Sequence, residues 1–271
     1  MAERVIRFEK DIHTALWGHE EWLVSAHPSA PSRVVEAAGR ALRVTGKTLH
    51  DICPGFPLMA KKIVAEKRLS VQVHPNVHSV KWTGGDAKTE MWCVLQSGPI
   101  FAGFKKGVTR EDVKRAIVDG GFEDLLVRFE AKPGECYLIP GGLVHAIGEG
   151  TVVYEIQQTS VTNLRLYDWG RVDADGRPRP LHIEGGLMAM NVSFPPPVPS
   201  QGVKCPYFEF YKLVSGGETP PPRGDDSGGG AVSAAHWRIV YDPKADDCFL
   251  LPPDSDVEIP TGAWVTIVGC F

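Results

Sequence analysis

The feature that most constrains the fold of this chain is a succession of short apolar segments separated by turns that contain glycine or proline. From residue 56 onward the sequence contains FPLMAKKIV, LSVQVHP, EMWCVL, ECYLIP and TVVYEIQQ between such turns. Segments of this length, rich in β-branched and aromatic residues, are typical of strands. The 29 glycines and 22 prolines among 271 residues suit many tight turns better than a helical bundle. The pattern predicts a mainly β protein.

Two interruptions of this pattern predict how the chain is divided. In GVTREDVKRAIVDGGFEDLLVRF, Thr109 and Asp112 have the spacing of a helix capping box, which predicts a helical insertion over about 109–127. After residue 191 the sequence FPPPVPSQG is typical of an extended connector, because proline fixes φ and donates no backbone hydrogen bond. We therefore predict a main domain over 1–195 and a smaller C-terminal β unit over 196–271.

Charge and composition exclude several partners. The formal net charge is -4 and no run of lysine or arginine resembles a patch that follows a nucleic-acid backbone, so a nucleic-acid partner is not expected. No stretch of about 18 apolar residues occurs and the first residues lack an apolar core, so we expect a cytoplasmic protein without a membrane partner. The six cysteines include no CxxC pair, which argues against a zinc ribbon or a thioredoxin-type motif.

The strand-like segment LSVQVHPN carries polar residues where a core strand would carry apolar ones. Side chains alternate across a strand, so Ser70, Gln72 and His74 share one face and the apolar residues between them share the other. The polar face is therefore expected to point toward something other than an apolar core.

A second group of residues has the spacing of a cupin motif. Gly134, five residues, Pro140, Gly142, two residues and His145 follow one another in the order of the second cupin motif. In the first motif, Gln72 stands in place of the first histidine and a longer loop precedes Glu90. With these two departures the chain resembles the type I mannose-6-phosphate isomerases, which are related to cupins.

The resemblance extends in order over about residues 15–190. It is carried by LWG, FPLMAKKI, LSVQVHPN, AKTEMWCVL, YLIPGGLVHAIGEGTVVYEIQQTS, RLYDWGR and LHI. It implies a cupin (jelly-roll) β-barrel with the helical insertion, followed by a smaller cupin-like β unit. It also implies that residues 1–195 form the metal-binding isomerase domain, with one zinc ion per chain and a small sugar phosphate as substrate. The implied metal ligands are Gln72, His74, Glu90 and His145.

The chemistry of these four side chains suits a catalytic metal. Two imidazoles, a carboxylate and a carboxamide oxygen form a borderline-to-hard site that leaves a position for water or a sugar oxygen. Zinc fits such a site, and manganese, cobalt or iron are compatible with it. The alternative is that Gln72 and His74 only satisfy backbone groups inside the barrel.

The implied reaction, aldose–ketose isomerisation through an enediol, needs a base that moves a proton between C2 and C1. In TVVYEIQQ, Glu155 shares a face with Val153 and Gln157, so it projects inward if that face lines the barrel. We therefore predict Glu155 as the base. The alternative is a structural carboxylate paired with Arg165 or Lys88.

Two cations are further candidates. Arg165 matches an active-site arginine of the family, where a guanidinium can stabilise an enediolate or bind a sugar oxygen. Lys88 precedes Glu90 by two residues and is predicted to contact substrate; the alternative is a solvated lysine in a turn. Arg171 is a weaker candidate, because it can simply bond the YDWGR turn.

One departure from the family concerns the base. Where the family has an aspartate after the EIQQ strand, this chain has Val161. Either Glu155 alone serves as the base, or the chain is a non-catalytic sugar-binding or regulatory cupin that kept its metal. A metal oxygenase on the same barrel is less attractive, because the ligand set lacks a further histidine.

Overall fold

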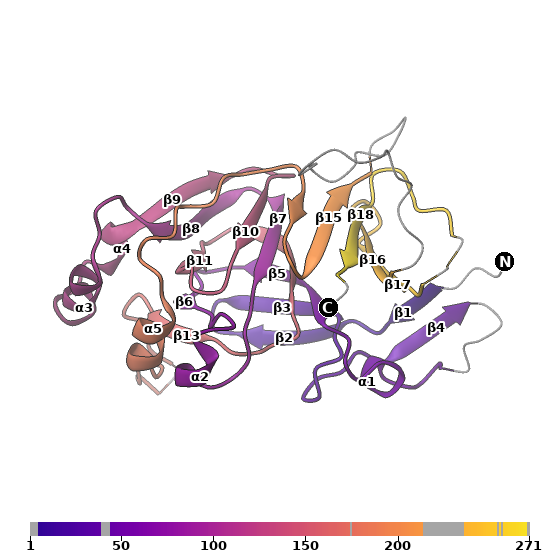
Figure 1. Ribbon diagram of the computed structural model, residues 1–271, viewed down its shortest axis with the longest axis horizontal. Coiled ribbons are helices and arrows are strands. Elements are labelled where there is room, and N and C mark those ends of the chain that lie inside the picture. Colours follow the sequence, from indigo (N-terminus) through magenta and orange to yellow (C-terminus); the bar gives the residue numbers. More distant parts are fainter. Residues whose placement is uncertain are drawn as a thin grey trace. The chain divides into compact units, whose positions relative to one another are not determined.

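The computed structural model describes residues 5–38, 44–173, 175–213, 236–253, 255 and 257–269. Of the described residues, 41% lie in strands and 12% in helices, so the structure is mostly β, which confirms the predicted class. Contacts between Cα atoms group it into two units. The first unit comprises residues 1–13, 21–62 and 200–271, and the second comprises 14–20 and 63–199. Figure 1 labels their strands and helices.

The first unit contains a seven-stranded antiparallel sheet in the order β14-β15-β18-β16-β17-β1-β4. Its strands are β1 (Val5–Phe8), β4 (Val34–Ala38), β14 (Val203–Lys204), β15 (Phe208–Lys212), β16 (Arg238–Asp242), β17 (Asp247–Leu251) and β18 (Trp264–Val268), and the short helix α1 spans Leu49–Ile52. Thr48 caps α1 with a capping box. One core cluster of the unit contains Val240, Phe249, Leu251 and Ala263.

The two units divide the chain differently from the predicted domains 1–195 and 196–271. Residues 1–13 and 21–62 group with the C-terminal residues, because β1 pairs with β17 through Ile6 and Leu250. Pairing between strands so far apart in sequence leaves no trace in local periodicity.

The second unit contains the whole of one sheet and part of another. The five-stranded sheet has the order β13-β6-β11-β8-β9. Its strands are β6 (Val71–Val73), β8 (Gly98–Phe104), β9 (Leu126–Ala131), β11 (His145–Ile147) and β13 (Leu164–Tyr167). The six-stranded sheet has the order β10-β7-β12-β5-β3-β2. Of its strands, β7 (Glu90–Gln96), β10 (Cys136–Ile139) and β12 (Val152–Gln158) belong wholly to this unit, whereas the chain crosses between units within β2 (Asp11–Ala15), β3 (Gly18–Val24) and β5 (Leu58–Ala65).

The core of the second unit lies between its two layers of strands. One buried cluster contains Trp92 and Val94 from β7 together with Ile100 and Ala102 from β8. Residues of the two sheets therefore pack face to face, as in a double-sheet architecture. The polar side chains on the inner face of β6 are therefore expected in this interior.

Helices cover the other face of the five-stranded sheet. Phe101 of β8 alternates with the inward residues Ile100 and Ala102 and packs outward. Phe104 packs on the same outer face because the register of the strand shifts between Phe101 and Phe104. They join a cluster with residues of α3 (Arg110–Asp119), α4 (Phe122–Leu125) and α5 (Ile183–Ala189). Figure 1 shows α3 and α4 beside β8 and β9, and α5 beside β13.

The predicted helical insertion at 109–127 corresponds to α3 and α4, and β9 begins at Leu126. Both hydrogen bonds of the capping box form: the Thr109 hydroxyl accepts from the Asp112 backbone N–H at 3.2 Å, and the Asp112 carboxylate accepts from the Thr109 backbone N–H at 2.9 Å. The helix α3 ends at Asp119 and is followed by the C-cap residue Gly120, whose φ of +90° glycine adopts without strain.

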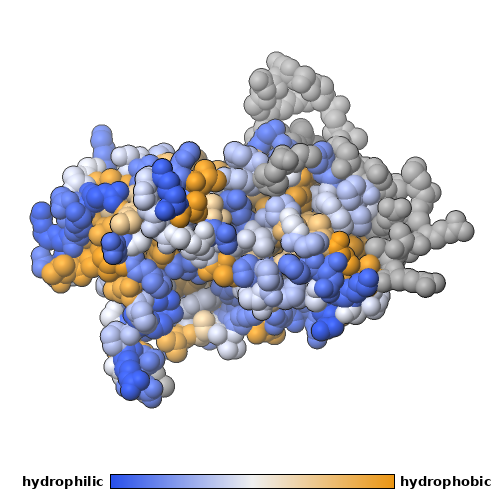
Figure 2. All heavy atoms as spheres, turned by 60° about the horizontal axis from the view of Figure 1, so that its bottom comes forward, coloured by the Kyte–Doolittle hydropathy of each residue, from blue (hydrophilic) through white to orange (hydrophobic). Residues whose placement is uncertain are grey.

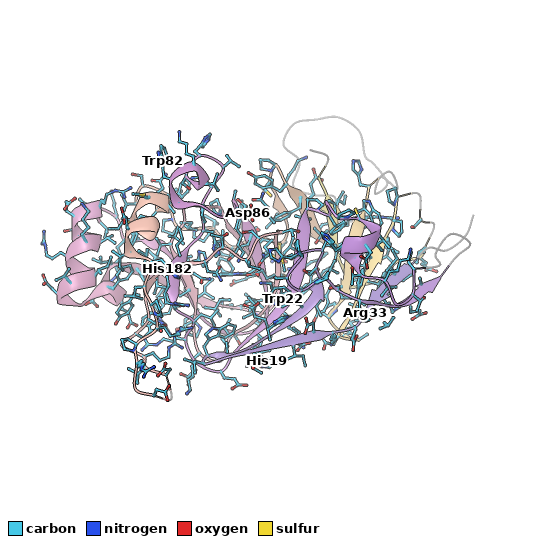
Figure 3. The ribbon with its side chains drawn as sticks, turned by 90° about the horizontal axis from the view of Figure 1, so that it is seen from below. His19, Trp22, Arg33, Trp82, Asp86 and His182 are labelled. Atoms are coloured by element: carbon cyan, nitrogen blue, oxygen red, sulfur yellow. The ribbon has the colours of Figure 1, made fainter. Side chains whose placement is uncertain are left out.

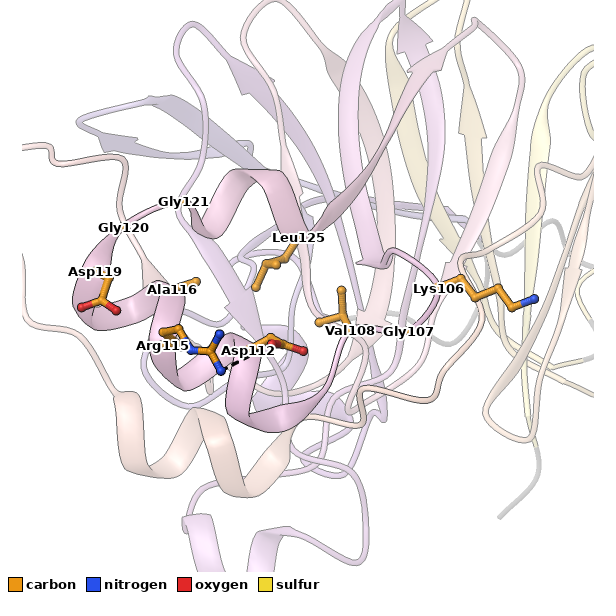
Figure 4. Close-up of a pocket in the computed structure, with 10 residues that line it drawn as sticks. All are labelled: Lys106, Gly107, Val108, Asp112, Arg115, Ala116, Asp119, Gly120, Gly121 and Leu125. Atoms are coloured by element: carbon orange, nitrogen blue, oxygen red, sulfur yellow. Dashed lines mark ion pairs between the residues drawn. The ribbon is translucent and has the colours of Figure 1, made fainter.

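A hollow of about 390 Å³ lies beside this insertion. It is lined by Lys106, Gly107, Val108, Asp112, Arg115, Ala116, Asp119, Gly120, Gly121 and Leu125. Figure 4 shows the ion pair between Arg115 and Asp112 at its edge, with an N–O distance of 3.9 Å. None of its lining residues is a predicted site residue.

On the visible face in Figure 2, hydrophilic residues are interspersed with smaller hydrophobic patches. Trp82, which is 63% exposed, projects from α2 (Val80–Thr83) in Figure 3. Among the described residues, no helix has both the length and the apolar character that a membrane span requires.

Candidate metal centre

The polar residues of β6 face the interior of the second unit. In the antiparallel pair of β11 and β6, His145 lies directly opposite Gln72, so their side chains share one face. Val71 and Val73 point to the opposite face and pack in the cluster with the helices. The alternation predicted for LSVQVHPN is therefore present.

Three buried side chains converge at this point. One ligand atom of each of His74, Glu90 and His145 lies within 4.8 Å of the others. His74 Nε2 is 3.1 Å from Glu90 Oε2, and His145 Nε2 is 3.4 Å from Glu90 Oε1. The Gln72 carboxamide nitrogen is 3.4 Å from His145 Nε2. The structure thus brings all four predicted ligands together.

Backbone carbonyls fix the tautomers of both histidines. His74 Nδ1 is 2.9 Å from the Thr162 carbonyl oxygen, and His145 Nδ1 is 2.9 Å from the Leu143 carbonyl oxygen. A carbonyl oxygen only accepts, so Nδ1 carries the proton of each neutral ring and Nε2 is left with a lone pair. Both lone pairs face the Glu90 carboxylate, an arrangement that a bound cation satisfies.

The protonation states of the three groups suit metal binding. Burial and the neighbouring Lys88 together lower the pKa of His74 to about 3, although the Glu90 carboxylate acts to raise it. Burial also lowers the pKa of His145. Burial acts to raise the pKa of Glu90, but Lys88 and the two histidines hold it well below its usual value. At neutral pH the site therefore has two neutral imidazoles and an ionised carboxylate, the forms that ligate metals.

Lys88 belongs to the same cluster. It is 4% exposed, and its Nζ is 2.8 Å from Glu90 Oε2 and 3.3 Å from His74 Nε2. Burial acts to lower the pKa of Lys88, but the carboxylates of Glu90 and Glu155 raise it above its usual value. The alternative of a solvated turn lysine is therefore wrong.

Glu155 lies on the same side of the sheet as Glu90. In the pairing of β12 with β7, Glu155 is opposite Trp92 and Gln157 is opposite Glu90. Glu155 is 2% exposed, and its Oε2 accepts a hydrogen bond of 3.0 Å from the Trp92 indole N–H. The indole holds this carboxylate close enough to Lys88 for the two charges to attract each other.

Arg165 lies beside the centre, opposite Gln72 in the pairing of β13 with β6. Its Nε donates to the Ser70 hydroxyl at 3.2 Å and its Nη1 donates to the Pro180 carbonyl oxygen at 2.7 Å. Arg171 donates to Asp168 at 2.6 Å and so bonds its own turn. Val161 is 44% exposed.

Three contributors to this geometry were not predicted. Trp92 could have been found, because it follows Glu90 by two residues and shares its face of the strand. The carbonyl groups of Thr162 and Leu143 orient the histidines, but a backbone carbonyl leaves no signal in a sequence.

Comparisons with known proteins show which proteins the chain is similar to. No family model matches the chain. GmuF of Bacillus subtilis, described as a probable mannose-6-phosphate isomerase, is 32% identical over 262 residues, which cover 86% of this chain and 83% of GmuF. The mannose 6-phosphate isomerase structure from Bacillus subtilis is 24% identical with a TM-score of 0.76, covering 98% of this chain and all of that one. A mannose 6-phosphate isomerase structure bound with zinc and yttrium is 12% identical with a TM-score of 0.64, at coverages of 98% and 100%. The structural likenesses confirm the predicted cupin fold.

Proposed function

The chain belongs to the mannose-6-phosphate isomerase family, and from this premise we propose that it interconverts mannose 6-phosphate and fructose 6-phosphate in the cytoplasm. The observation that carries the proposal is the pair of imidazole lone pairs, from His74 and His145, that face the buried carboxylate of Glu90.

We propose zinc as the ion held by Gln72, His74, Glu90 and His145. Support comes from the donor set, which has the nitrogen and oxygen ligands that zinc accepts, and from the zinc in a structure of the same fold. Manganese, cobalt and iron are compatible with the same donors. When bound, the ion supplies a Lewis acid that polarises a substrate oxygen.

Glu155 is the proposed base. Its carboxylate takes the proton from C2 of the open-chain aldose, and the electron pair of that bond forms the C1–C2 double bond of an enediol. Return of the proton to C1, with loss of the proton from the C2 hydroxyl and gain of one at O1, yields the ketose. Trp92 donates to Oε2 of Glu155 and so holds the carboxylate in one orientation.

The two cations have separate proposed roles. Lys88 contacts substrate near the reacting carbons, since it already lies against His74 and Glu90. Its ammonium group can donate to an oxygen that becomes negative in the enediolate. Arg165 binds another oxygen of the substrate from its position beside Gln72.

The non-catalytic alternative rests on Val161 alone. Val161 carries no ionisable group, so the aspartate of the family cannot act here. Glu155 provides a buried carboxylate close to Lys88, so proton transfer does not depend on residue 161. We therefore retain the isomerase.

A coupled assay with mannose 6-phosphate on zinc-loaded and chelated protein tests the proposal. We expect turnover that is lost on chelation and restored by zinc, and deuterium exchange at C2 in heavy water. Full turnover by the metal-stripped protein would exclude the metal-dependent mechanism. Saturable sugar binding without any exchange at C2 would support the non-catalytic alternative instead.

A further inference from the structure

A cluster of arginines follows β13 in the second unit. The Asp168 carboxylate accepts from Arg179 through both of its oxygens, from Nε at 2.8 Å and from Nη2 at 2.6 Å. It also accepts from Arg171 Nη2 at 2.6 Å. Asp168 is 5% exposed, so this carboxylate holds two guanidinium groups in defined orientations.

The segment that carries Arg179 is fixed against β13. The Arg165 backbone N–H donates to His182 Nδ1 at 3.0 Å, and the His182 N–H donates back to the Arg165 carbonyl oxygen at 2.7 Å. His182 is the N-cap residue of α5, and Figure 3 labels it beside that helix. The Pro180 carbonyl then accepts from Arg165 Nη1 at 2.7 Å. These bonds keep Arg179 close to Arg165.

The cluster has more positive than negative charge. Arg165, Arg171 and Arg179 face the single carboxylate of Asp168, and the side-chain partners of Arg165 are a hydroxyl and a carbonyl. Burial lowers the pKa of Arg165, and repulsion from Arg179 and Arg171 lowers it further. Holding like charges together in a partly buried place is unfavourable unless an anion joins them.

Two donors of the cluster remain for such an anion. In the described part of the chain, Arg165 Nη2 and Arg179 Nη1 have no hydrogen-bond partner, while their other guanidinium nitrogens are engaged. Arg165 bonds the carbonyl of Pro180, which is next in the chain to Arg179, so the two guanidinium groups lie close together. A pair of neighbouring guanidinium groups suits the tetrahedral oxygens of a phosphate group.

The position of the cluster relative to the metal centre suits a substrate phosphate. Arg165 starts opposite Gln72 and reaches back to Ser70, which precedes Gln72 by about 7 Å along an extended chain. In a hexose 6-phosphate, the phosphate is at the end of the carbon chain opposite to C1 and C2. A sugar with its reacting carbons at the metal centre can therefore extend its phosphate toward the arginines.

We propose that Arg165 and Arg179 bind the phosphate group of the substrate, and that Asp168 is a positioning residue that orients Arg179. This inference rests on the proposed function for the identity of the sugar phosphate. It assigns to these arginines the choice of a phosphorylated sugar over the free sugar.

The test is calorimetric titration of the zinc-loaded protein with mannose 6-phosphate, mannose and inorganic phosphate. In Arg179→Gln we expect binding of mannose 6-phosphate to weaken by about 10- to 100-fold, the loss typical of a hydrogen bond to a charged group. Binding of mannose should stay unchanged, and in the assay KM for mannose 6-phosphate should rise while kcat changes little. Arg179→Lys keeps the positive charge but loses the paired N–H donors of the guanidinium group. Its affinity for mannose 6-phosphate should lie between those of the wild type and Arg179→Gln.

The matched control is Arg177→Gln, which makes the same charge change at an exposed arginine of the same segment. It should leave all three affinities unchanged. Equal loss of mannose and mannose 6-phosphate binding in Arg179→Gln, or no loss of either, would overturn the subsite. Zinc content and thermal unfolding show whether each variant folds.

The wild-type protein gives a test that needs no variant. An affinity for mannose 6-phosphate no tighter than that for mannose would reject the subsite even if isomerisation is observed. Binding of inorganic phosphate that mannose 6-phosphate displaces, without any isomerisation, would keep the subsite and reject the proposed function.

Discussion

The two units of the molecule bury different kinds of polar group. The second unit buries a carboxylate, an ammonium and two imidazoles in one cluster, with Glu90 at its centre. The described part of the first unit has no buried carboxylate. Its two buried cations are Arg238, which donates to the Ser255 carbonyl at 2.8 Å, and Lys61, which lies over the Trp22 ring.

The difference indicates where the chemistry is located. Removing a carboxylate and its partners from water costs several kcal/mol per ion, and replacing such a cluster by apolar residues is often stabilising. A fold that needed only stability would pack this place as the first unit packs Val240 and Leu251. Clusters of ionisable groups with displaced pKa values are typical of functional sites. The first unit is therefore expected to contribute stability without chemistry.

The largest expected effect comes from removing a ligand, His145→Ala. Substituting groups that only orient a ligand costs roughly 10- to 100-fold in metal affinity, so loss of the ligand itself should exceed that range. We expect bound zinc and isomerisation to be lost together, measured by metal analysis and the coupled assay. His78→Ala changes an exposed histidine close in sequence to His74 and should have no effect. Full zinc content with full activity in His145→Ala would remove the metal centre from the mechanism.

The second largest effect is expected for Glu155→Gln, which keeps the acceptor for the Trp92 indole but removes the base. General bases typically contribute ~100- to 10,000-fold, so kcat and deuterium exchange at C2 should fall by that range. Zinc content should be unchanged, because Glu155 is not a proposed ligand. Glu149→Gln, at an exposed position before β12, is the control. Exchange at the wild-type rate would show that another group carries the proton.

The parts of this site that the sequence predicted are those set by local rules. Gln72 and His74 share a face because side chains alternate between the two faces of a strand. Thr109 caps α3 because a threonine and an aspartate three residues later each accept a hydrogen bond from the other's backbone N–H. The proximity of Arg179 to Arg165 and the pairing of β1 with β17 depend on tertiary packing. No local pattern contains that information, so the arginine cluster and the composition of the first unit could only be seen in the structure.

Leu251→Ala tests whether the first unit contributes only stability. Leu251 is fully buried in a cluster with Val240, Phe249 and Ala263, so truncation should reduce the free energy of unfolding by about 2–5 kcal/mol. The zinc content and kcat of the folded protein should stay at wild-type values, measured below the unfolding transition. Val35→Ala, at a 51% exposed position, should change stability by less than about 0.5 kcal/mol. A loss of zinc in Leu251→Ala would show that the first unit supports the chemistry directly.

The smallest effect is expected for Asp246→Asn, at an ion-pair cluster of the first unit. Asp246 accepts from Lys10 Nζ and the Tyr241 hydroxyl, both at 2.8 Å, and from Lys62 Nζ at 3.0 Å. Burial acts to raise the pKa of Asp246, but these hydrogen bonds lower it to about 2. The φ of Asp246 is +50°, a conformation that asparagine also tolerates, so the substitution mainly removes the charge.

The direction of the pH dependence follows from the lowered pKa. A carboxylate whose pKa is lower in the folded than in the unfolded protein stabilises the fold above the unfolded value, and this contribution is lost as pH falls toward the folded value. Asp246→Asn should therefore cost less than about 1 kcal/mol at neutral pH, because the side chain is partly exposed. The difference from wild type in chemical denaturation should vanish between about pH 4 and pH 2. Glu9→Gln, at an exposed acid of the same unit, should show no such convergence, and a difference for Asp246→Asn that grows with acid would contradict the assigned hydrogen bonds.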